Sequence, residues 1–230
     1  VSTGNILDSN FTENSAINGG AVYVGGNSQN SKISHVIFDS NKATKNGGAI
    51  DWNATAGNLT HTKFINNEAD YGAALCREAN SGGGFGFNNT FIGNHARISG
   101  AALGWMGSVG ININRYFFYN NTADVSGGAI YVGPNSANCT VNNSIFWANS
   151  VTDLIDGYGG AIDCEAENLT SLNTTFRENK AAYGGAIWIG SDSGHSIIQN
   201  STFFLNEAYY DGCAINLRAS SVSVNDPRYD

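Results

Sequence analysis

A single pattern recurs eight times along this chain and restricts the possible folds more than any other feature. Each copy contains Phe-x-x-Asn and, five to ten residues after the asparagine, a glycine element that reads Gly-Gly-Ala-aliphatic or a close variant. Successive phenylalanines are 26–30 residues apart, which indicates a repeat protein whose copies pack against their neighbours. The phenylalanine–asparagine pairs are Phe11/Asn14, Phe38/Asn41, Phe64/Asn67, Phe91/Asn94, Phe118/Asn121, Phe146/Asn149, Phe176/Asn179 and Phe203/Asn206. The glycine elements begin at Gly19, Gly47, Gly72, Gly100, Gly127, Gly159, Gly184 and Gly212.

Each repeat contains three short apolar runs, and together they predict a β-solenoid. One run lies about five residues before the phenylalanine, one surrounds it, and one follows the glycines. Short runs bounded by turn residues are typical of strands. We therefore expect an all-β fold, a parallel β-helix of about eight coils with three short strands per coil of about 27 residues. The residues that precede the phenylalanines are Ile6, Ile33, Leu59, Ile113, Val141 and Ile198, with Phe87 and Leu172 in this place in the fourth and seventh repeats.

Stacked coils place the same repeat position in one row, with about 4.8 Å between neighbours. The phenylalanines then fill the interior, where stacked rings add to the burial of apolar area. The asparagines are expected to bond amide to amide along the axis and to tolerate the left-handed backbone of a corner. Gly-Gly-Ala provides a corner with little crowding, and its second position stays small where it is Ala73, Ala101 or Cys213.

The repeats run through residues 1–230 without a linker, so we expect a single domain. In one repeat the connection before the glycine element is nine residues long, SVTDLIDGY at 150–158, and we expect it to bulge from a corner. Val1 begins within a coil, and residues 220–230 supply only part of another. Because the end coils of a solenoid need caps, we expect this chain to be a fragment of a longer surface protein.

The charge and hydropathy of the chain disfavour several classes of partner. The formal net charge is −8, the isoelectric point is about 4.8, and no run of basic residues occurs. Nucleic acid and anionic membrane surfaces are therefore unfavourable partners. No apolar stretch reaches the roughly 20 residues of a membrane-spanning helix, so no membrane insertion is expected within this chain.

The cysteines and acids match no recognised metal or redox spacing. We expect most of the thiols to be buried at strand positions, and a Cys139–Cys164 bridge between neighbouring repeats is the alternative. A calcium ion at Asp153 and Asp156 in the long connection is a second open possibility, although the spacing is not that of a known calcium loop. The four cysteines are Cys76, Cys139, Cys164 and Cys213.

The combination of GGA[ILV] and FxxN at this spacing resembles the passenger-type repeats of polymorphic outer-membrane proteins. With 32 asparagines and only 13% charged residues, the chain also resembles the adhesin-like surface proteins of methanogenic archaea. The resemblance covers essentially the whole chain. It implies a right-handed parallel β-helix, display at the cell surface, and attachment to other cells or to polymers. It implies no catalytic residues and no cofactor, because the shared motifs are structural.

The alternative of a carbohydrate-active enzyme rests on the same fold, which also hosts polysaccharide lyases and hydrolases. These enzymes need clustered acids, or a base beside calcium-binding acids, whereas the acids here are scattered. Asp163 and Glu165 form the best acid pair for a catalytic variant. His35 and His61 occupy one repeat position, three residues before a phenylalanine, where most other repeats have Asp or Asn. We interpret this position as a polar row, not as a catalytic site.

The residue after each glycine element should point outward, because side chains alternate along a strand. This outward row mixes aromatic rings with acids and amides, which suits sugar rings. We therefore expect a non-enzymatic, adhesin-like module that binds glycans or proteins on other cells. Ordinary strand composition also explains the aromatic residues, and it would fit a passive structural spacer. The candidate binding residues are Tyr23, Asp51, Tyr131, Asp163, Glu165, Trp188 and Asn216.

Asn-x-Ser/Thr sequons occur ten times, about twice the roughly five that 32 asparagines and 36 serines and threonines would give by chance. Part of the excess follows from the repeat itself. We expect glycosylation at some exposed sites, in keeping with an extracellular location. The sequons begin at Asn10, Asn53, Asn58, Asn88, Asn120, Asn138, Asn142, Asn168, Asn173 and Asn200.

Overall fold

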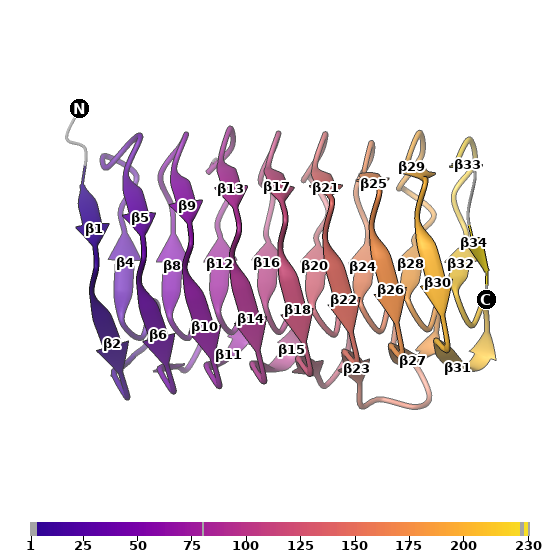
Figure 1. The fold of residues 1–230 in the computed structure, drawn as a ribbon, viewed down its shortest axis with the longest axis horizontal. Coiled ribbons are helices and arrows are strands. Elements are labelled where there is room, and N and C mark those ends of the chain that lie inside the picture. The colour runs from indigo at the N-terminus through magenta and orange to yellow at the C-terminus, as the bar shows by residue number, and fades with distance from the viewer. Residues whose placement is uncertain (1–3, 80, 226–227, 230) are drawn as a thin grey trace.

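The computed structural model describes residues 4–79, 81–225 and 228–229, and these form a parallel β-solenoid (Figure 1). Each coil adds one strand to each of four parallel sheets, so that the coils follow one another along the long axis (Figure 1). The expected all-β parallel solenoid of about eight coils is therefore confirmed. The prediction made for Val1 lies outside the described residues.

The strands of the four sheets are short, and neighbours within each sheet come from successive coils. The first sheet contains β1 (Asn5–Leu7), β5 (Lys32–Ser34), β9 (Asn58–Thr60), β13 (Phe85–Phe87), β17 (Asn112–Asn114), β21 (Thr140–Asn142), β25 (Thr170–Leu172), β29 (Ile197–Gln199) and β33 (Ser223–Asn225). The second contains β2 (Asn10–Thr12), β6 (Ile37–Asp39), β10 (Lys63–Ile65), β14 (Thr90–Ile92), β18 (Phe117–Tyr119), β22 (Ile145–Trp147), β26 (Thr175–Arg177), β30 (Thr202–Phe204) and β34 (Arg228–Tyr229). The third contains β3 (Ser15–Ala16), β7 (Lys42–Ala43), β11 (Glu68–Tyr71), β15 (His95–Ser99), β19 (Thr122–Ala123), β23 (Ser150–Val151), β27 (Lys180–Tyr183) and β31 (Glu207–Asp211). The fourth contains β4 (Val22–Val24), β8 (Ile50–Trp52), β12 (Leu75–Arg77), β16 (Leu103–Trp105), β20 (Ile130–Val132), β24 (Ile162–Cys164), β28 (Ile187–Ile189) and β32 (Ile215–Leu217).

The third sheet is an addition to the three strands per coil that the sequence predicts. Its strands begin directly after the repeat asparagine and contain two to five residues. Their inward side chain is mostly alanine, and Ala43, Ala69 and Ala96 belong to a second, small core. Hydrophobic patterning does not reveal these strands, because a row of methyl groups over so few residues produces no apolar run.

The repeat phenylalanines form one stacked row through the main core, as expected. Successive ring centroids are 4.4–5.1 Å apart from Phe11 to Phe203. The six rings from Phe38 to Phe176 are completely buried. Aliphatic side chains of the first and fourth sheets, such as Ile33 and Ile50, complete this core.

The repeat asparagines form a second row, and their side chains bond along the axis as predicted. Between successive coils, Nδ2 of one asparagine donates to Oδ1 of the next at 2.9–3.0 Å. The same Oδ1 accepts the backbone N–H of the preceding coil's asparagine at 3.0–3.1 Å. From Asn41 onward, Nδ2 also donates to the carbonyl oxygen of the preceding coil's phenylalanine at 2.9–3.2 Å. The row thus pairs buried backbone groups that a bare corner would leave unsatisfied.

The left-handed backbone expected at these asparagines lies one residue earlier. The residues before the asparagines have φ between 50° and 62°, whereas the asparagines themselves are not among the described residues with positive φ. The reason is that the buried amide must point inward to bond along the axis, so its more exposed neighbour completes the turn. The left-handed residues are Glu13, Ser40, Asn66, Gly93, Asn120, Ala148, Glu178 and Leu205.

Each coil has two further corners, of which the sequence predicts the glycine corner and, at the other, only a polar row. The polar position three residues before each phenylalanine has φ between 47° and 57°, and the rings of His35 and His61 stack there with centroids 4.9 Å apart. The first glycine of each glycine element has φ between 53° and 69°. At the second glycine position a side chain meets backbone: a Cβ on Gly48 would overlap the carbonyl oxygen of Ala73. The first position of this corner therefore requires glycine for its backbone conformation, whereas the second position admits only small residues, such as Ala73 in the next coil.

Two core positions differ from the prediction. The sequence favoured Phe87 and Leu172 as the inward residues of the fourth and seventh repeats, but the strand register places Gly86 and Ser171 there. Shifting the pairing of this strand by one residue would move all its side chains to the opposite face. The pairing register therefore decides which residue points inward, even where the neighbouring side chain is larger. Tyr116 of the next coil compensates for the first gap, because its hydroxyl occupies the space that a Cβ on Gly86 would need.

The long connection leaves the solenoid as expected and hangs below the coils between β23 and β24 (Figure 1). Leu154 and Ile155 are 46% and 68% exposed. Asp153 Oδ1 accepts the backbone N–H groups of Ile155 at 2.8 Å and Asp156 at 3.1 Å. One of the two acids considered for calcium is therefore already engaged in closing its own turn.

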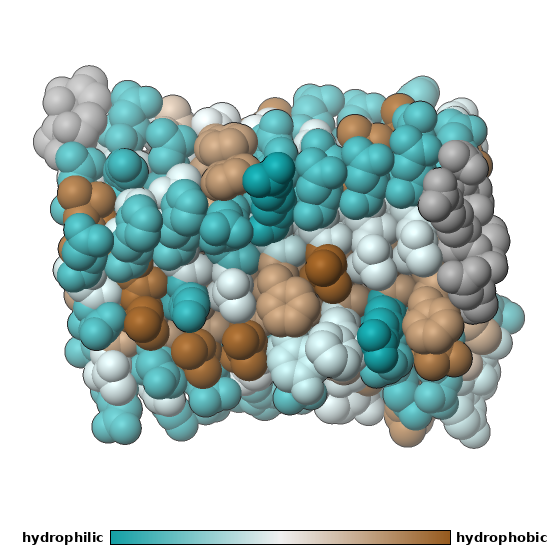
Figure 2. Space-filling model, viewed as in Figure 1, coloured by the Kyte–Doolittle hydropathy of each residue, from teal (hydrophilic) through white to brown (hydrophobic). Residues whose placement is uncertain are grey.

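All four cysteines are free thiols, so the alternative Cys139–Cys164 bridge is not formed. Three of them are buried, as expected, and Cys213 is exposed. No helix within the described ranges is long and apolar enough to cross a lipid bilayer. Figure 2 shows the face formed by the first and second sheets, where rows of hydrophilic residues alternate with scattered hydrophobic ones.

The phenylalanine row predicts a large loss of stability when one interior ring is removed. Phe118 is fully buried between Phe91 and Phe146, with centroids 5.1 Å and 4.4 Å away. We expect Phe118→Ala to lower the free energy of unfolding in urea by about 3–5 kcal/mol, because a large cavity remains. Phe11→Ala, at a half-buried end position, should cost less. A loss below about 1 kcal/mol for Phe118→Ala would contradict this role.

The asparagine row predicts that stability depends more on the hydrogen-bond donor of the side chain than on the volume of the side chain. Nδ2 of Asn121 donates to two acceptors, Asn149 Oδ1 and the Phe91 carbonyl. Asn121→Asp would place a buried carboxylate against both, and we expect a loss above about 3 kcal/mol in urea denaturation at neutral pH. Asn121→Ala should cost about 1–3 kcal/mol. Equal losses for the two variants would show that the donor function is unimportant.

Candidate functional site

The fourth sheet carries a row of side chains that face away from the core. The residues on either side of most members, such as Ile50 and Trp52 beside Asp51, belong to the main core. Strand pairing keeps the members in register from β4 to β32. This outer row consists of Tyr23, Asp51, Cys76, Gly104, Tyr131, Asp163, Trp188 and Asn216. It contains six of the seven predicted binding residues, and Glu165 follows directly after β24.

Facing outward does not leave the outer row open to solvent. Tyr23 is 57% exposed, whereas Asp51 and Asp163 are each only 2% exposed. Tyr131 and Trp188 are half-buried. The structure therefore brings the predicted residues into one line but leaves only part of that line accessible to a ligand.

The outer row is covered by the residues that directly precede the glycine elements. These residues pair with one another from coil to coil and form a second line, which we call the corner wall. The ring centroid of Tyr158 lies 4.5 Å from that of Trp188, and Asn216 Nδ2 donates to the carbonyl of Asp211 at 3.2 Å. A Cβ on Gly104 would lie 3.7 Å from the carbonyl carbon of Tyr71, so the two lines are in contact. The corner wall consists of Asn46, Tyr71, Ser99, Ser126, Tyr158, Tyr183 and Asp211.

Asp163 and Glu165 form a pair of neighbouring carboxyl groups at this junction. Burial raises the pKa of both, and the charge of Glu165 raises the pKa of Asp163 further, well above its usual range. Trp188 Nε1 donates to Glu165 Oε1 at 2.9 Å, which favours the charged form of Glu165. Asp163 Oδ1 has no hydrogen-bond partner among the described residues. The surroundings therefore favour the neutral form of Asp163 more strongly than that of Glu165.

The outer row and the corner wall border an open pocket of about 620 Å³ in the last coils. Three aromatic rings gather there: the centroid of Tyr183 lies 5.6 Å from that of Tyr158 and 6.1 Å from that of Trp188. The guanidinium carbon of Arg218 lies 5.5 Å from the Trp188 centroid. Aromatic faces beside a few polar groups are typical of small-molecule sites. The lining residues are Tyr158, Glu165, Tyr183, Trp188, Gly190, Ser191, Asp211 and Arg218.

Sequence reasoning identified Glu165 and Trp188 but missed the other aromatic and charged members of this pocket. Tyr158 and Tyr183 precede glycine elements, a position that varies in chemistry from repeat to repeat. The sequence did contain a signal for this position, because tyrosine precedes the glycine element in a third repeat as well, at Tyr71. Arg218 lies two residues after the outer-row position and reaches over the preceding coil's tryptophan. Only the stacking of coils makes that contact visible.

Comparisons with known proteins support the repeat type and say little about the ligand. The family model for the Chlamydia polymorphic membrane protein repeat matches residues 35–51, 116–133 and 173–190. One segment of this chain is 34% identical over 104 residues to metabotropic glutamate receptor-like protein R of Dictyostelium discoideum. That alignment covers 45% of this chain but only 6% of the relative. No solved structure gives a significant match. The repeats thus fit the polymorphic-membrane-protein type of β-helix, whereas no match bears on the resemblance to archaeal adhesin-like proteins.

The buried carboxyl of Asp163 predicts a stability that falls as pH rises. Its pKa is raised from an ordinary value of 3.8, so the folded chain binds this proton more tightly than the unfolded chain does. Its contribution is complete below about pH 4 and is lost as pH rises toward the folded pKa. Asp163→Asn mimics the neutral form, and we expect it to flatten the decline in unfolding free energy between about pH 4 and 8. Urea denaturation across this range measures the slope, and an unchanged slope in the variant would contradict the assignment.

Proposed function

We propose that this chain is a non-enzymatic module of a cell-surface protein that attaches to glycans on other cells through the pocket around Trp188. The observation that carries this proposal is the pocket itself, with its three aromatic rings beside Glu165, Asp211 and Arg218. Aromatic faces accept the apolar face of a sugar ring, and the charged groups can bond to its hydroxyls. The rings are fixed in place, so a sugar would bind without ordering them first.

Trp188 is held in position by contacts on three sides. Its indole N–H donates to Glu165, its ring packs against Tyr158, and Arg218 lies over it. Arg218 is in turn held by Asp211, with Nη2 and Oδ2 3.7 Å apart. Because the N–H is already engaged, a ligand would meet the part of the ring that borders the pocket, and this supports apolar contact as its mode of recognition.

A location at the cell surface is supported by the comparison, since the matched repeat belongs to a family of outer-membrane surface proteins. The matched β-helix repeats are typical of non-catalytic, adhesin-like proteins. Attachment to glycans on other cells goes beyond these comparisons, and its support comes from the pocket around Trp188.

The acid pair supports binding more than bond cleavage. Glycoside hydrolysis needs two carboxyl groups on either side of the bond that breaks. Glu165 lines the pocket, but Asp163 is 2% exposed and lies outside the lining. A ligand in the pocket would therefore meet only one carboxylate of the pair, and the other acid of the lining, Asp211, lies against Arg218.

The proposal is tested by binding of the labelled chain to a glycan array and to whole cells. We expect Trp188→Ala to weaken a detected interaction at least about tenfold, as loss of a central aromatic contact does. The chain contains a matched control in Trp147, whose Nε1 donates to Glu178 at 2.8 Å and which lies beneath Arg177, on the second sheet. Trp147→Ala removes a similarly held ring but leaves the pocket intact, and it should bind as the unmodified chain does.

Other outcomes distinguish the alternatives. If Tyr131→Ala weakens binding as strongly as Trp188→Ala, the ligand lies along the outer row and is not confined to the pocket. If Trp188→Ala leaves a detected interaction unchanged, the pocket is not the binding site. If a longer chain binds cells but this module does not, it is a passive spacer. Release of reducing sugars or unsaturated products from a panel of polysaccharides would establish an enzyme instead.

A further inference from the structure

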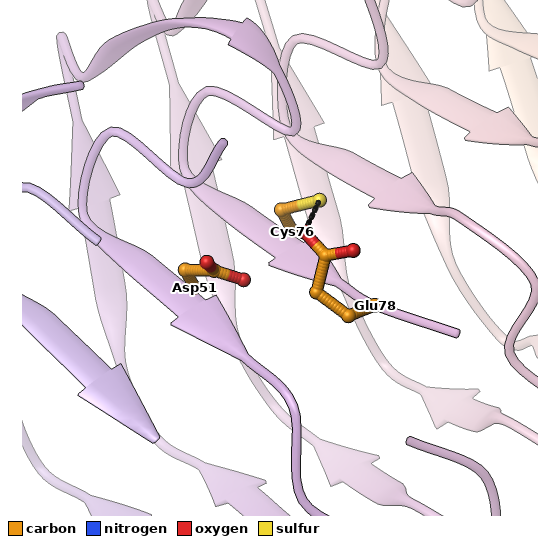
Figure 3. Close-up of side chains that lie close together, drawn as sticks. All are labelled: Asp51, Cys76 and Glu78. Atoms are coloured by element: carbon orange, nitrogen blue, oxygen red, sulfur yellow. Dashed lines mark hydrogen bonds between the residues drawn. The ribbon is translucent and has the colours of Figure 1, made fainter. Parts of the chain in front are cut away.

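A second cluster of reactive side chains lies in the early coils, away from the pocket. It joins Asp51 on β8 with Cys76 on β12, its neighbour in the outer row, and Glu78, which follows β12 (Figure 3). One ligand-type atom from each residue lies within 4.8 Å of the other two. Cys76 Sγ is 3.9 Å from Glu78 Oε1. Figure 3 shows the thiol and both carboxyl groups on the same side of the sheet.

The cluster brings three acidic groups together without a basic side chain paired to them. Asp51 is 2% exposed, and its Oδ1 has no hydrogen-bond partner among the described residues. Cys76 is completely buried. Within the described part of the chain, no lysine, arginine or histidine forms an ion pair with Asp51 or Glu78. Buried charges normally have a partner or coordinate a metal, so this site is adapted to a positively charged occupant.

We propose that Asp51, Cys76 and Glu78 form a binding site for a divalent transition-metal ion of the zinc type. The donor set is one thiol and two carboxyl groups, and it can supply three of four ligands in a tetrahedral site. The fourth position would face Glu78, the half-buried member of the cluster, through which solvent and ion can enter.

The chemistry of the donors selects this class of ion. A thiolate favours zinc and other soft or borderline ions, whereas calcium and magnesium bind oxygen ligands, with calcium needing six to eight. In a tetrahedral site with metal–ligand distances of about 2.0–2.3 Å, ligand atoms are about 3.3–3.5 Å apart. The 3.9 Å between Cys76 Sγ and Glu78 Oε1 is close to this value, so small side-chain rotations would complete the site.

An outer contact already orients one of the ligands. Asn46 of the corner wall donates from Nδ2 to Glu78 Oε1 at 2.6 Å. Metal-binding carboxylates are commonly held by such hydrogen bonds. Burial and both neighbouring acids raise the pKa of the Cys76 thiol, and burial and Glu78 raise the pKa of Asp51 to about 7. These shifts favour the protonated forms of Cys76 and Asp51, and a metal would displace those protons.

The chain provides a matched comparison at Asp163 and Glu165. That pair also has a buried aspartate with an unpartnered oxygen, but its outer-row neighbours are Tyr131 and Trp188, which offer no third metal ligand of the same kind. The cysteine in the outer row is thus what distinguishes the proposed metal site from the other acid pair.

The experiment uses Co²⁺ and Zn²⁺ with the reduced chain carrying Cys213→Ser, which removes the exposed thiol. We expect one ion per chain by calorimetry and, with Co²⁺, the near-ultraviolet absorption of a cobalt–thiolate bond. Cys76→Ser should abolish this absorption. Glu78→Gln should weaken binding by more than about tenfold, and Asn46→Ala by about tenfold. Circular dichroism establishes that each variant is folded, and if Cys76→Ser is not, Glu78→Gln at its half-buried position decides.

The controls are Cys139→Ser, a buried thiol in another part of the core, and Glu165→Gln at the matched acid pair. Both should bind the ion as the reference chain does, and excess Ca²⁺ should not displace it. The proposal is overturned if no ion binds at micromolar concentration, if the cobalt–thiolate absorption survives in Cys76→Ser, or if Cys139→Ser removes it equally. Binding that Glu165→Gln abolishes would place the ion at the other acid pair and would also overturn it.

Discussion

The parallel pairing of one coil with the next is the constraint on which the rest of the structure depends. Because each strand pairs in register with its equivalent about one repeat away, every repeat position becomes a row along the axis. A residue is therefore acceptable only if it can stack on its own kind or on a compatible neighbour. Phenylalanine rings and asparagine amides meet this condition in every coil. The phenylalanine row fills the main core, and the asparagine row lies at the corner that follows it.

This constraint explains which features could be predicted from sequence. The phenylalanine and asparagine rows, the glycine corner and the polar corner at His35 follow from a repeating side-chain requirement, which the sequence displays directly. The third sheet could not be predicted, because its buried face consists of single methyl groups. Gly86 was misplaced because Phe87 is the larger apolar residue, although register with neighbouring coils, not size, decides which side chain points inward.

The candidate sites were only partly predictable for a related reason. Alternation along a strand was sufficient to align Asp51 with Asp163 and Trp188 in the outer row. It could not reveal burial, because the corner wall belongs to another segment of each coil and covers the row from the side. The pocket and the Asp51–Cys76–Glu78 cluster both combine residues from different coils, so the distances that define them depend on stacking and are absent from any local pattern.

The rows also separate architecture from function within one repeat. The phenylalanine and asparagine positions keep one chemistry through all coils, since a change there disturbs two neighbours. The outer row reads Tyr, Asp, Cys, Gly, Tyr, Asp, Trp and Asn in successive coils, and both of its aspartates are buried with an unpartnered oxygen. Such groups cost stability, and the many regular contacts of the solenoid can offset that cost. The irregular row on a regular frame is therefore where side-chain chemistry can vary without disturbing the fold.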